Sequence, residues 1–485
     1  MTQERGPRLD RRAVVGGAAA LTAVAAGGAA RAAAPRRKYA IVGTGHRSRM
    51  FQDAIWGPHK DASELVAVCD LNPGRVAYTQ RRSREAGAKQ PRGYVHTDFE
   101  RMIRETKPET IIVTTVDATH DNYIVRALEA GCDVITEKPM TTTAAKAQRI
   151  IDACQRTGRN IRVTFNYRYS PPRTQIKDLL MSGEIGDVLS VDFNWLLNTN
   201  HGADYFRRWH SNKANSGGLM VHKATHHFDL VNWWLSALPQ TVWAYGKREF
   251  YTPTMAKRLG LKGAHERCRT CPEKDKCSFY LDLAADPSLK ALYIDNEKYD
   301  GYFRDQCVWR PEINIEDTMN VIVKYDTGAT LSYSLNACNA WEGYNIAFNG
   351  TKGRIEHSIV EQVYVAGGDM VQGGIQPGGV TTRVMPLRGA PRIIEPWTGT
   401  GGHGGGDDVM LADIFAAEGA RPDKYFRVSD QNGGAYSILI GAAANRCFET
   451  GGPVNIAEMA TGLRRPAYAP MPTRNDPVPM PPRKA

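Results

Sequence analysis

The sequence predicts two domains, the first α/β with a doubly wound parallel sheet and the second α+β with antiparallel strands. The chain has 485 residues, which is longer than one ordinary hydrophobic core supports. Apolar strands alternate with helical segments as far as residue 165, a pattern typical of a parallel sheet. Beyond that point strand-like segments are separated by hairpin turns such as residues 326–328.

The first 34 residues have the composition of an export signal. Arg11 and Arg12 precede an uncharged Ala/Gly/Val/Leu run over residues 13–30, and small residues around Ala30 offer cleavage sites. The run is only weakly apolar, which suits a twin-arginine signal better than a membrane anchor. We therefore expect recognition by the twin-arginine export machinery and a periplasmic or extracellular protein.

The net charge of +11 does not indicate nucleic-acid binding. Residues 1–38 contain eight Lys or Arg against two acidic residues, so six of the eleven charges lie at this end. No stripe of basic and aromatic residues accompanies the remainder, which excludes a nucleic-acid role. No other segment approaches the ~18 apolar residues of a membrane span. Residues 466–485 contain seven prolines and are expected to form an extended or disordered tail.

A dinucleotide-binding turn follows the first predicted strand. Residues 38–42 are apolar, and Gly43-Thr-Gly45-His-Arg47-Ser48 comes directly after them. Gly43 permits the tight turn, Gly45 lets a pyrophosphate approach the backbone, and the small Ser48 lets the helix lie close to the strand. We assign these residues, with Arg47, to cofactor binding. A glycine turn in an unrelated α/β protein is the weaker alternative.

The second predicted strand, residues 64–69, ends in Asp70. A carboxylate at this distance from the turn accepts hydrogen bonds from the ribose diol of a dinucleotide. No basic residue immediately follows Asp70 in residues 71–73, and Asp70 would repel a 2′-phosphate. The sequence therefore predicts NAD rather than NADP.

Polar residues also follow later strands of the first domain. Strands are expected at residues 109–115, 133–136 and 160–165, and ligands bind at the carboxyl ends of such strands. Thr115, His120 and Glu137 are therefore assigned to the cofactor site. Lys138 at this edge would lie near the nicotinamide and polarise a substrate hydroxyl or carbonyl.

Three segments together carry a resemblance to a known family. Glu137-Lys138-Pro139, the glycine turn and Phe165-Asn166-Tyr-Arg168-Tyr-Ser-Pro171 resemble the Gfo/Idh/MocA oxidoreductases, and the resemblance covers residues 38–465. It implies a Rossmann domain over residues 38–165. It also implies a substrate and oligomerisation domain over residues 166–465, built on a large, mostly antiparallel sheet. Arg168 and Asn166 become a cofactor and a substrate contact, and a homo-oligomer is expected.

The segment Ser216–Asp229 carries the other catalytic residues that the resemblance implies. Family members place Asp-x-x-x-His opposite the lysine with an Asp three residues beyond, so the histidine falls on His226 and the later carboxylate on Asp229. The first carboxylate position is His222, with Lys223 beside it. We expect His226 to be the acid-base group and His222 to tune it or contact substrate, with Lys223 and Asp229 as substrate contacts. A metal held by the two histidines is a weaker alternative, since the Glu of H-E-x-x-H is missing.

The spacing of apolar residues in this segment predicts a helix. Phe228, Val231 and Leu235 recur on one face, and His222 and His226, four residues apart, would share another side.

Two further segments are expected at the substrate. Residues 201–210 are rich in His, Tyr and Arg around Trp209, whose ring can stack on a sugar or anchor a surface loop. The glycine loop 401–407 contains His403, which we expect to reach the same pocket.

Four of the nine cysteines lie in an insertion at about residues 250–312 that is rich in Lys, Asp and Tyr. Their types and number suit a tetrahedral structural zinc, and a protein folded before export can load metal first. Disulfides are the first alternative, because an exported protein meets oxidising conditions, and free thiols the second. The cysteines concerned are Cys268, Cys271, Cys277 and Cys307.

These observations predict an exported oxidoreductase that acts on a sugar, polyol or glycoside. Free nicotinamide is not readily recycled outside the cytoplasm, so we expect NAD to stay tightly bound and turnover to be redox-neutral. One alternative is a glycoside hydrolase or lyase that works through a 3-keto intermediate. Another is a protein that binds NAD and sugar without catalysis.

Overall fold

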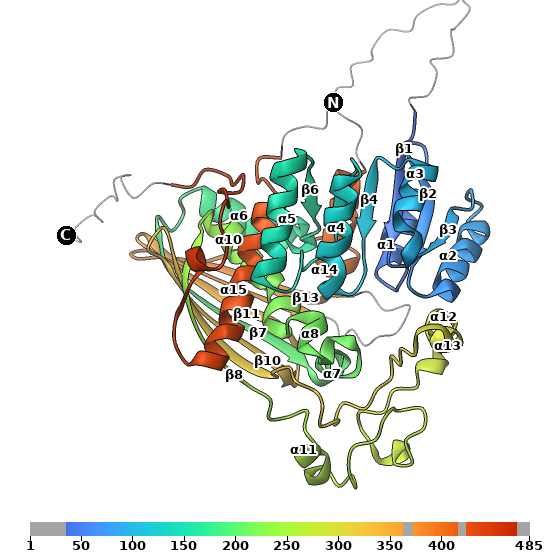
Figure 1. Ribbon diagram of the computed structural model, residues 1–485. Coiled ribbons are helices and arrows are strands. Elements are labelled where there is room, and N and C mark those ends of the chain that lie inside the picture. Colours follow the sequence, from blue (N-terminus) through green and yellow to red (C-terminus); the bar gives the residue numbers. More distant parts are fainter. Residues whose placement is uncertain (1–34, 362–371, 416–422, 473–485) are drawn as a thin grey trace, which may run out of the picture. The chain divides into compact units, whose positions relative to one another are not determined.

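Two sheets organise the chain (Figure 1). The computed structural model describes residues 35–361, 372–415 and 423–472. The predicted export signal at residues 1–34 and the last part of the proline-rich tail lie outside these residues. Where the structure describes the tail, at residues 466–472, it has neither helix nor strand. No helix among the described residues is long and apolar enough to cross a membrane.

The first sheet is parallel throughout and has the order β3-β2-β1-β4-β5-β6. This is the doubly wound arrangement of dinucleotide-binding domains, so the predicted Rossmann domain is confirmed. Its central strands are buried because helices cover both faces. The strands are β1 (Arg37–Val42), β2 (Ser63–Asp70), β3 (Arg92–Val95), β4 (Thr110–Val113), β5 (Asp133–Thr136) and β6 (Ile161–Val163). The helices are α1 (Ser48–Trp56), α2 (Pro73–Glu85), α3 (Phe99–Thr106), α4 (His120–Glu129) and α5 (Ala144–Thr157).

The start of α2 sets the geometry next to Asp70. The side chain of Asn72 accepts hydrogen bonds from the backbone N–H groups of Gly74 and Arg75, and Pro73 occupies the first helical position. This cap holds the first turn of α2 against the end of β2. Arg75 is thereby brought beside Asp70, although four residues separate them in the sequence.

The second sheet has nine strands in the order β14-β13-β12-β11-β7-β10-β9-β8-β15. All neighbours are antiparallel except β7 and β10, which confirms a large, mostly antiparallel sheet. The predicted hairpin joins β9 to β10 through residues 326–329. The strands are β7 (Val188–Asn198), β8 (Pro239–Lys247), β9 (Thr318–Tyr325), β10 (Thr330–Asn339), β11 (Glu342–Gly350), β12 (Gly353–Glu361), β13 (Ile375–Pro386), β14 (Arg392–Ile394) and β15 (Val454–Asn455).

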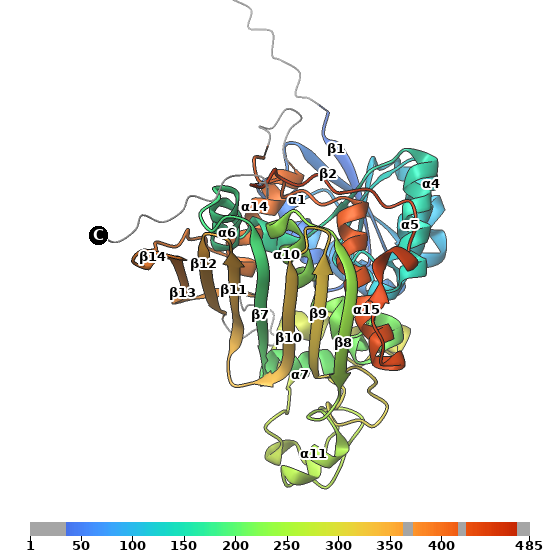
Figure 2. The same cartoon turned by 90° about the vertical axis from the view of Figure 1, so that its left-hand side faces the viewer.

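Helices cover one face of this sheet, and Figure 2 shows the strands from the other face. Trp195, Trp233 and Trp234 lie fully buried in the core between the strands and the helices. The long helix α15 packs on β8 and also on α5, so it links the two sheets. The helices of this half are α6 (Pro171–Met181), α7 (Thr199–Arg207), α8 (Lys213–Ser216), α9 (Leu219–His222), α10 (Thr225–Leu235), α14 (Gly402–Ile414) and α15 (Gln431–Thr450).

The structure corrects the expected single helix through His222 and His226. His222 ends α9 and His226 lies in α10, with Lys223 and Ala224 between the two helices. The carbonyl of Leu219 accepts hydrogen bonds from both intervening N–H groups, a wide turn that interrupts the helix. Phe228, Val231 and Leu235 are buried as expected, but so is every other residue of α10, so the burial is not confined to one face.

The cysteine-rich insertion lies between β8 and β9 and contains only short helices. These include α11 (Pro253–Arg258), α12 (Pro287–Leu292) and α13 (Glu297–Asp300). Leu289, Leu292 and Tyr293 pack with Tyr78 of α2, so the insertion shares a small core with the Rossmann domain. The two domains are therefore joined by the insertion as well as by α15.

Candidate active site

One cavity of about 520 Å³ joins the glycine turn, Asp70 and the predicted catalytic residues. Its walls come from the carboxyl ends of β1, β2, β4 and β5, from α9 and α10, and from the insertion. The residues predicted from sequence that line it are Gly43, Gly45, Arg47, Asp70, Thr115, His120, Glu137, Lys138, Trp209, His222, Lys223, His226 and His403.

The glycine turn has the geometry of a pyrophosphate cradle. Gly43 has φ +87°, and a Cβ there would lie 2.6 Å from the backbone of Thr114 and Thr115. At Gly45 a Cβ would meet nothing nearer than the Tyr293 hydroxyl at 3.5 Å, so this backbone is open to a ligand. Ser48 does not line the cavity. Its hydroxyl donates to the Gly45 carbonyl at 2.7 Å and so stabilises the conformation of the turn.

The charge around this turn favours an anion. Burial, together with the charges of the nearby Arg304, Arg49, Arg208 and Arg47, lowers the pKa of His46 to about 3. A group of arginines at the amino end of a helix suits a pyrophosphate. The chemistry and shape of these residues therefore fit a dinucleotide.

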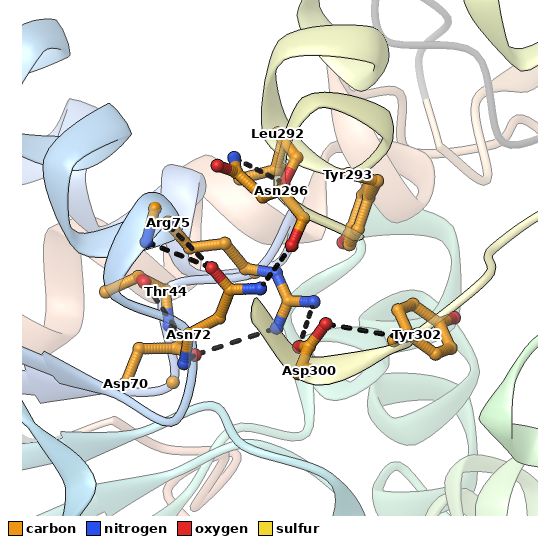
Figure 3. A network of polar contacts seen from close by, with 12 residues as sticks. Thr44, Asp70, Asn72, Arg75, Leu292, Tyr293, Asn296, Asp300 and Tyr302 are labelled. Atoms are coloured by element: carbon orange, nitrogen blue, oxygen red, sulfur yellow. Dashed lines mark hydrogen bonds and ion pairs between the residues drawn. The ribbon is translucent and has the colours of Figure 1, made fainter. Parts of the chain in front are cut away.

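Asp70 is fixed at the end of β2 as a hydrogen-bond acceptor (Figure 3). One carboxylate oxygen accepts from the backbone N–H of Thr44 at 2.5 Å and from its hydroxyl at 3.0 Å. The other accepts from the backbone N–H of Asn72 at 2.8 Å. The carboxylate is thus held at the cavity wall, where a ribose diol can donate to it.

Lys138 follows β5 and extends toward α9. Its Nζ donates to the backbone carbonyl of His222 at 3.1 Å. Burial lowers the pKa of Lys138 to about 8, against the opposing effect of Asp117 and Glu137. Arg47 of the glycine turn donates to Glu137 at 2.8 Å, so the negative charge of Glu137 is shared with this arginine. Asp117 is the other carboxylate whose charge raises the pKa of Lys138.

His222 has a carboxylate partner that the sequence did not indicate. Its Nδ1 lies 2.5 Å from Oδ2 of Asp117, in the short 3₁₀ turn Asp117–Thr119 after β4. Burial raises the pKa of Asp117 and lowers the pKa of His222. The positive charge of Lys138 lowers the pKa of His222 further. The signal available in the sequence was the position of Asp117 shortly after a parallel strand, where site residues gather.

His226 lacks such a partner. Its ring stacks on Tyr167 with centroids 4.4 Å apart, and its Nδ1 is buried without a hydrogen-bond partner in the described part of the chain. Burial and the charge of Lys138 lower its pKa well below the usual value. An unpartnered Nδ1 is best left without a proton, so neutral His226 presents an N–H donor at Nε2.

His403 has a second imidazole–carboxylate contact. Its Nδ1 lies 2.8 Å from Oδ2 of Asp407, and Asn166 donates to the other oxygen of Asp407 at 2.6 Å. His403 adopts φ +52° between glycines, a backbone conformation that places its ring against the cavity. Asn166 does not line the cavity, so it positions Asp407 instead of contacting substrate.

Lys223 and Trp209 lie where the sequence places them, at the cavity. The Lys223 ammonium is 4.8 Å from the ring centroid of Trp195 and 3.5 Å from the Tyr167 hydroxyl. Trp209 stacks on His210 with centroids 3.6 Å apart. These groups give the cavity both aromatic faces and charged donors.

Two further assignments are corrected by the structure. Arg168 donates to both oxygens of Asp229, at 2.7 and 2.6 Å, and the two side chains are 1% and 2% exposed. Neither lines the cavity, so this pair joins the start of the second domain to α10 and does not contact cofactor or substrate. A sequence motif gives proximity to the site without giving the direction of the side chain.

The four insertion cysteines line a separate small cavity, and all nine cysteines of the chain are free thiols. The disulfide alternative is therefore not observed. Among the described residues, no group of three or more His, Cys, Asp or Glu is arranged to hold a metal ion. The structure thus supports neither the predicted zinc site nor a metal between His222 and His226. Arg207 donates to the sulfur of Cys268 at 3.0 Å.

The sequence matches two family models along most of its length. Residues 37–165 match "Oxidoreductase family, NAD-binding Rossmann fold", and residues 177–456 match "Oxidoreductase family, C-terminal alpha/beta domain", both of the Gfo/Idh/MocA family.

Individual proteins and structures agree with these matches. YteT of Bacillus subtilis is 38% identical over 430 residues, which cover 86% of this chain and 98% of YteT. Inositol 2-dehydrogenase of Salmonella paratyphi B is 30% identical over 218 residues, 43% of this chain and 56% of that enzyme. The crystal structure of aldose-aldose oxidoreductase from Caulobacter crescentus with glycerol has a TM-score of 0.56 at 18% identity and covers 87% of this chain and all of that one, a likeness of fold. The chain belongs to the Gfo/Idh/MocA family of oxidoreductases and has the family's NAD-binding Rossmann domain.

Proposed function

We propose that the chain is an NAD-dependent oxidoreductase that acts on a ring carbon of a sugar, polyol or glycoside. The observation that carries this proposal is that one cavity joins the glycine turn and Asp70 to Lys138 and to the imidazoles of His222, His226 and His403. The names of the inositol dehydrogenase and the aldose-aldose oxidoreductase support a polyhydroxylated substrate. Trp209 and Lys223 supply an aromatic face and a cationic donor of the kinds that bind sugars.

Each residue has a role that follows from its surroundings. The glycine turn and Asp70 would hold NAD, and the bound nicotinamide would accept or return a hydride. Lys138 polarises the reacting oxygen, because its ammonium lies in a site with little water to screen it.

We assign the proton transfer to His222 instead of His226. Asp117 holds Nδ1 of His222 and leaves Nε2 as the nitrogen available to the cavity, the arrangement by which a carboxylate orients an imidazole base. A second proton on His226 would have to sit on its buried, unpartnered Nδ1. His226 is therefore assigned as a fixed hydrogen-bond donor to substrate.

The nicotinamide absorbance band tests the oxidoreductase proposal. Purified full-length protein is mixed with inositols, aldoses and glycosides, and the reduced-nicotinamide band is followed. A band that appears with one substrate class and is lost in Lys138→Ala supports the proposal. Absence of the band with every class, even transiently in rapid mixing, contradicts it.

A glycoside hydrolase or lyase remains the second candidate, and one observation favours it. The imidazole–carboxylate contacts at His222 and His403 face one cavity, so one group could remove a proton while the other protonates a leaving group. This reaction needs a carbonyl formed transiently beside the C–H bond that is broken. It predicts release of the aglycone without net NADH and deuterium uptake from D₂O at the adjacent carbon. Net NADH without uptake excludes it.

We further propose twin-arginine export, bound NAD that is kept through turnover, and a homo-oligomer. Exposed Trp243, Tyr245 and Ile322 on the strands of the second sheet support an oligomer surface. Export is tested by comparing how much protein reaches the periplasmic fraction in wild type and in the Arg11→Lys, Arg12→Lys double variant, which should reach it less. The oligomeric state is tested by measuring the mass of the purified protein by light scattering. A zinc in the insertion stays a proposal from the four cysteines of the sequence, and metal analysis of purified protein decides it.

A further inference from the structure

The insertion docks on the Rossmann domain at the ribose end of the cavity (Figure 3). The Asn72 amide donates to the backbone carbonyl of Asn296 at 2.9 Å, and Arg75 donates to Asp300 at 2.6 Å. The hydroxyl of Tyr293 accepts from the backbone N–H of His46 in the glycine turn at 3.0 Å. The insertion thus contacts both the cap of α2 and the cofactor turn.

The insertion packs so closely on α2 that Gly74 has no room for a larger side chain. A Cβ on Gly74 would lie 1.9 Å from the Oδ1 of Asn296. Tyr78, on the same helix, packs in a core with Leu289 and Leu292. The contact is therefore a packed interface and holds Asp300 in a defined place beside Arg75.

Arg75 lies between two carboxylates and two aromatic rings. Its guanidinium is 2.6 Å from Asp300 and 3.6 Å from Asp70, and its side chain is only 12% exposed. The ring centroids of Tyr293 and Tyr302 are 5.6 and 5.8 Å from the guanidinium carbon. All five side chains line the cavity. Arg75 lies beyond residues 71–73, the segment on which the prediction of NAD rested.

An arginine beside the ribose-binding carboxylate is the group that accommodates a 2′-phosphate in NADP enzymes, because the guanidinium binds phosphate with two hydrogen bonds. Here the guanidinium of Arg75 is already hydrogen-bonded to the carboxylate of Asp300. Asp70 and Asp300 thus place two negative charges beside the guanidinium of Arg75. An additional dianionic phosphate would have to displace Asp300 and be buried beside both carboxylates.

We propose that Asp300 of the insertion is a cofactor-specificity residue, which pairs with Arg75 so that the pocket accepts the free ribose 2′-hydroxyl of NAD and rejects the 2′-phosphate of NADP. This inference rests on the proposed function, since it requires that the cavity binds a nicotinamide dinucleotide. It predicts that selectivity is set jointly by the Rossmann domain and by a segment more than 200 residues later in the chain.

The test is calorimetric titration of full-length protein, stripped of nucleotide, with NAD⁺ and NADP⁺. Asp300→Asn removes the charge with little change of shape. Asp295→Asn is the matched control, because Asp295 lies in the same insertion, is 47% exposed and pairs with Lys290. We expect Asp300→Asn to tighten NADP⁺ binding by about tenfold or more, the effect of a freed charge-assisted contact, while NAD⁺ affinity changes by less than about threefold. The control should match wild type for both nucleotides.

A second variant separates selectivity from docking. Arg75→Gln, alone or with Asp300→Asn, removes the phosphate-binding group, so NADP⁺ should bind no better than to wild type. Equal weakening of both nucleotides in Asp300→Asn, or tighter NADP⁺ binding in Arg75→Gln, overturns the proposal. If wild type binds neither nucleotide, the proposed function fails as well, whereas an unchanged ratio in Asp300→Asn with NAD⁺ still bound removes only the role of Asp300.

Discussion

At the scale of single residues, the chemistry depends on groups whose pKa values are shifted by burial. Lys138 polarises the reacting oxygen only while it is protonated. Burial lowers its pKa to about 8, so the charged form is lost as pH rises through that value. We expect kcat/KM to fall about tenfold per pH unit on the alkaline side of this pKa. Steady-state rates between pH 6 and 10 measure this fall.

Lys138→Arg provides the control for this assignment. An arginine stays charged throughout the range, so the variant should be slower at neutral pH but should lack the alkaline fall near pH 8. The same alkaline fall in Lys138→Arg would show that another group titrates.

The roles assigned to His222 and His226 predict losses of kcat that differ in size. Without the Asp117 carboxylate, the Nδ1–H contact that orients His222 is lost, so Asp117→Asn should lower kcat by about 10²-fold or more. His226→Gln keeps a side-chain N–H donor and should lower kcat by less than about tenfold. Single-turnover rates with NAD bound measure both effects. A larger loss in His226→Gln than in Asp117→Asn would return the acid-base role to His226.

At the scale of helices and strands, the features predicted correctly from the sequence are those that depend on residues close together in the chain. The first strand was expected at residues 38–42 and is Arg37–Val42, and the hairpin between β9 and β10 was predicted from its turn residues. The interruption between α9 and α10 was missed, because an apolar repeat does not reveal a wide turn. Asp117 and Asp300 were missed because their partners come from other elements, and only the packing of those elements brings them together.

The end of α10 gives a prediction of its own. Lys177 is buried, and its Nζ donates to the carbonyls of Trp233 and Trp234 at 2.7 and 3.2 Å and to the Ser236 hydroxyl at 2.8 Å. These contacts satisfy carbonyls that the helix leaves free. Lys177→Met should lower the free energy of unfolding by about 1–3 kcal/mol, measured by urea denaturation.

The pH dependence of this effect has a definite sign. Burial lowers the pKa of Lys177 to about 7, from 10.5 for the unfolded chain. Between these values the unfolded state binds a proton that the folded state does not, so stability rises with pH. The stability of wild type relative to Lys177→Met should therefore increase from pH 7 to pH 10. A constant difference would contradict this shift.

At the scale of the whole molecule, the site is built from both domains and the insertion. The Rossmann domain supplies Asp70 and Lys138, the second domain supplies His222 and His226, and the insertion supplies Asp300. The helix α15 packs on elements of both domains. A ligand in this cavity therefore contacts parts of the chain that are far apart in sequence, and its binding should stabilise them together.

Thermal unfolding tests this coupling. NAD⁺ at about 100 times its Kd should stabilise the protein by about 2.7 kcal/mol and raise the midpoint of one cooperative transition. Asp70→Ala should lose most of this shift, because it removes the ribose acceptor. Asp192→Ala, a change of a half-exposed carboxylate on β7, should keep the shift. If NAD⁺ raises the midpoint of only one of two separate transitions, the domains unfold independently and the cavity does not couple them.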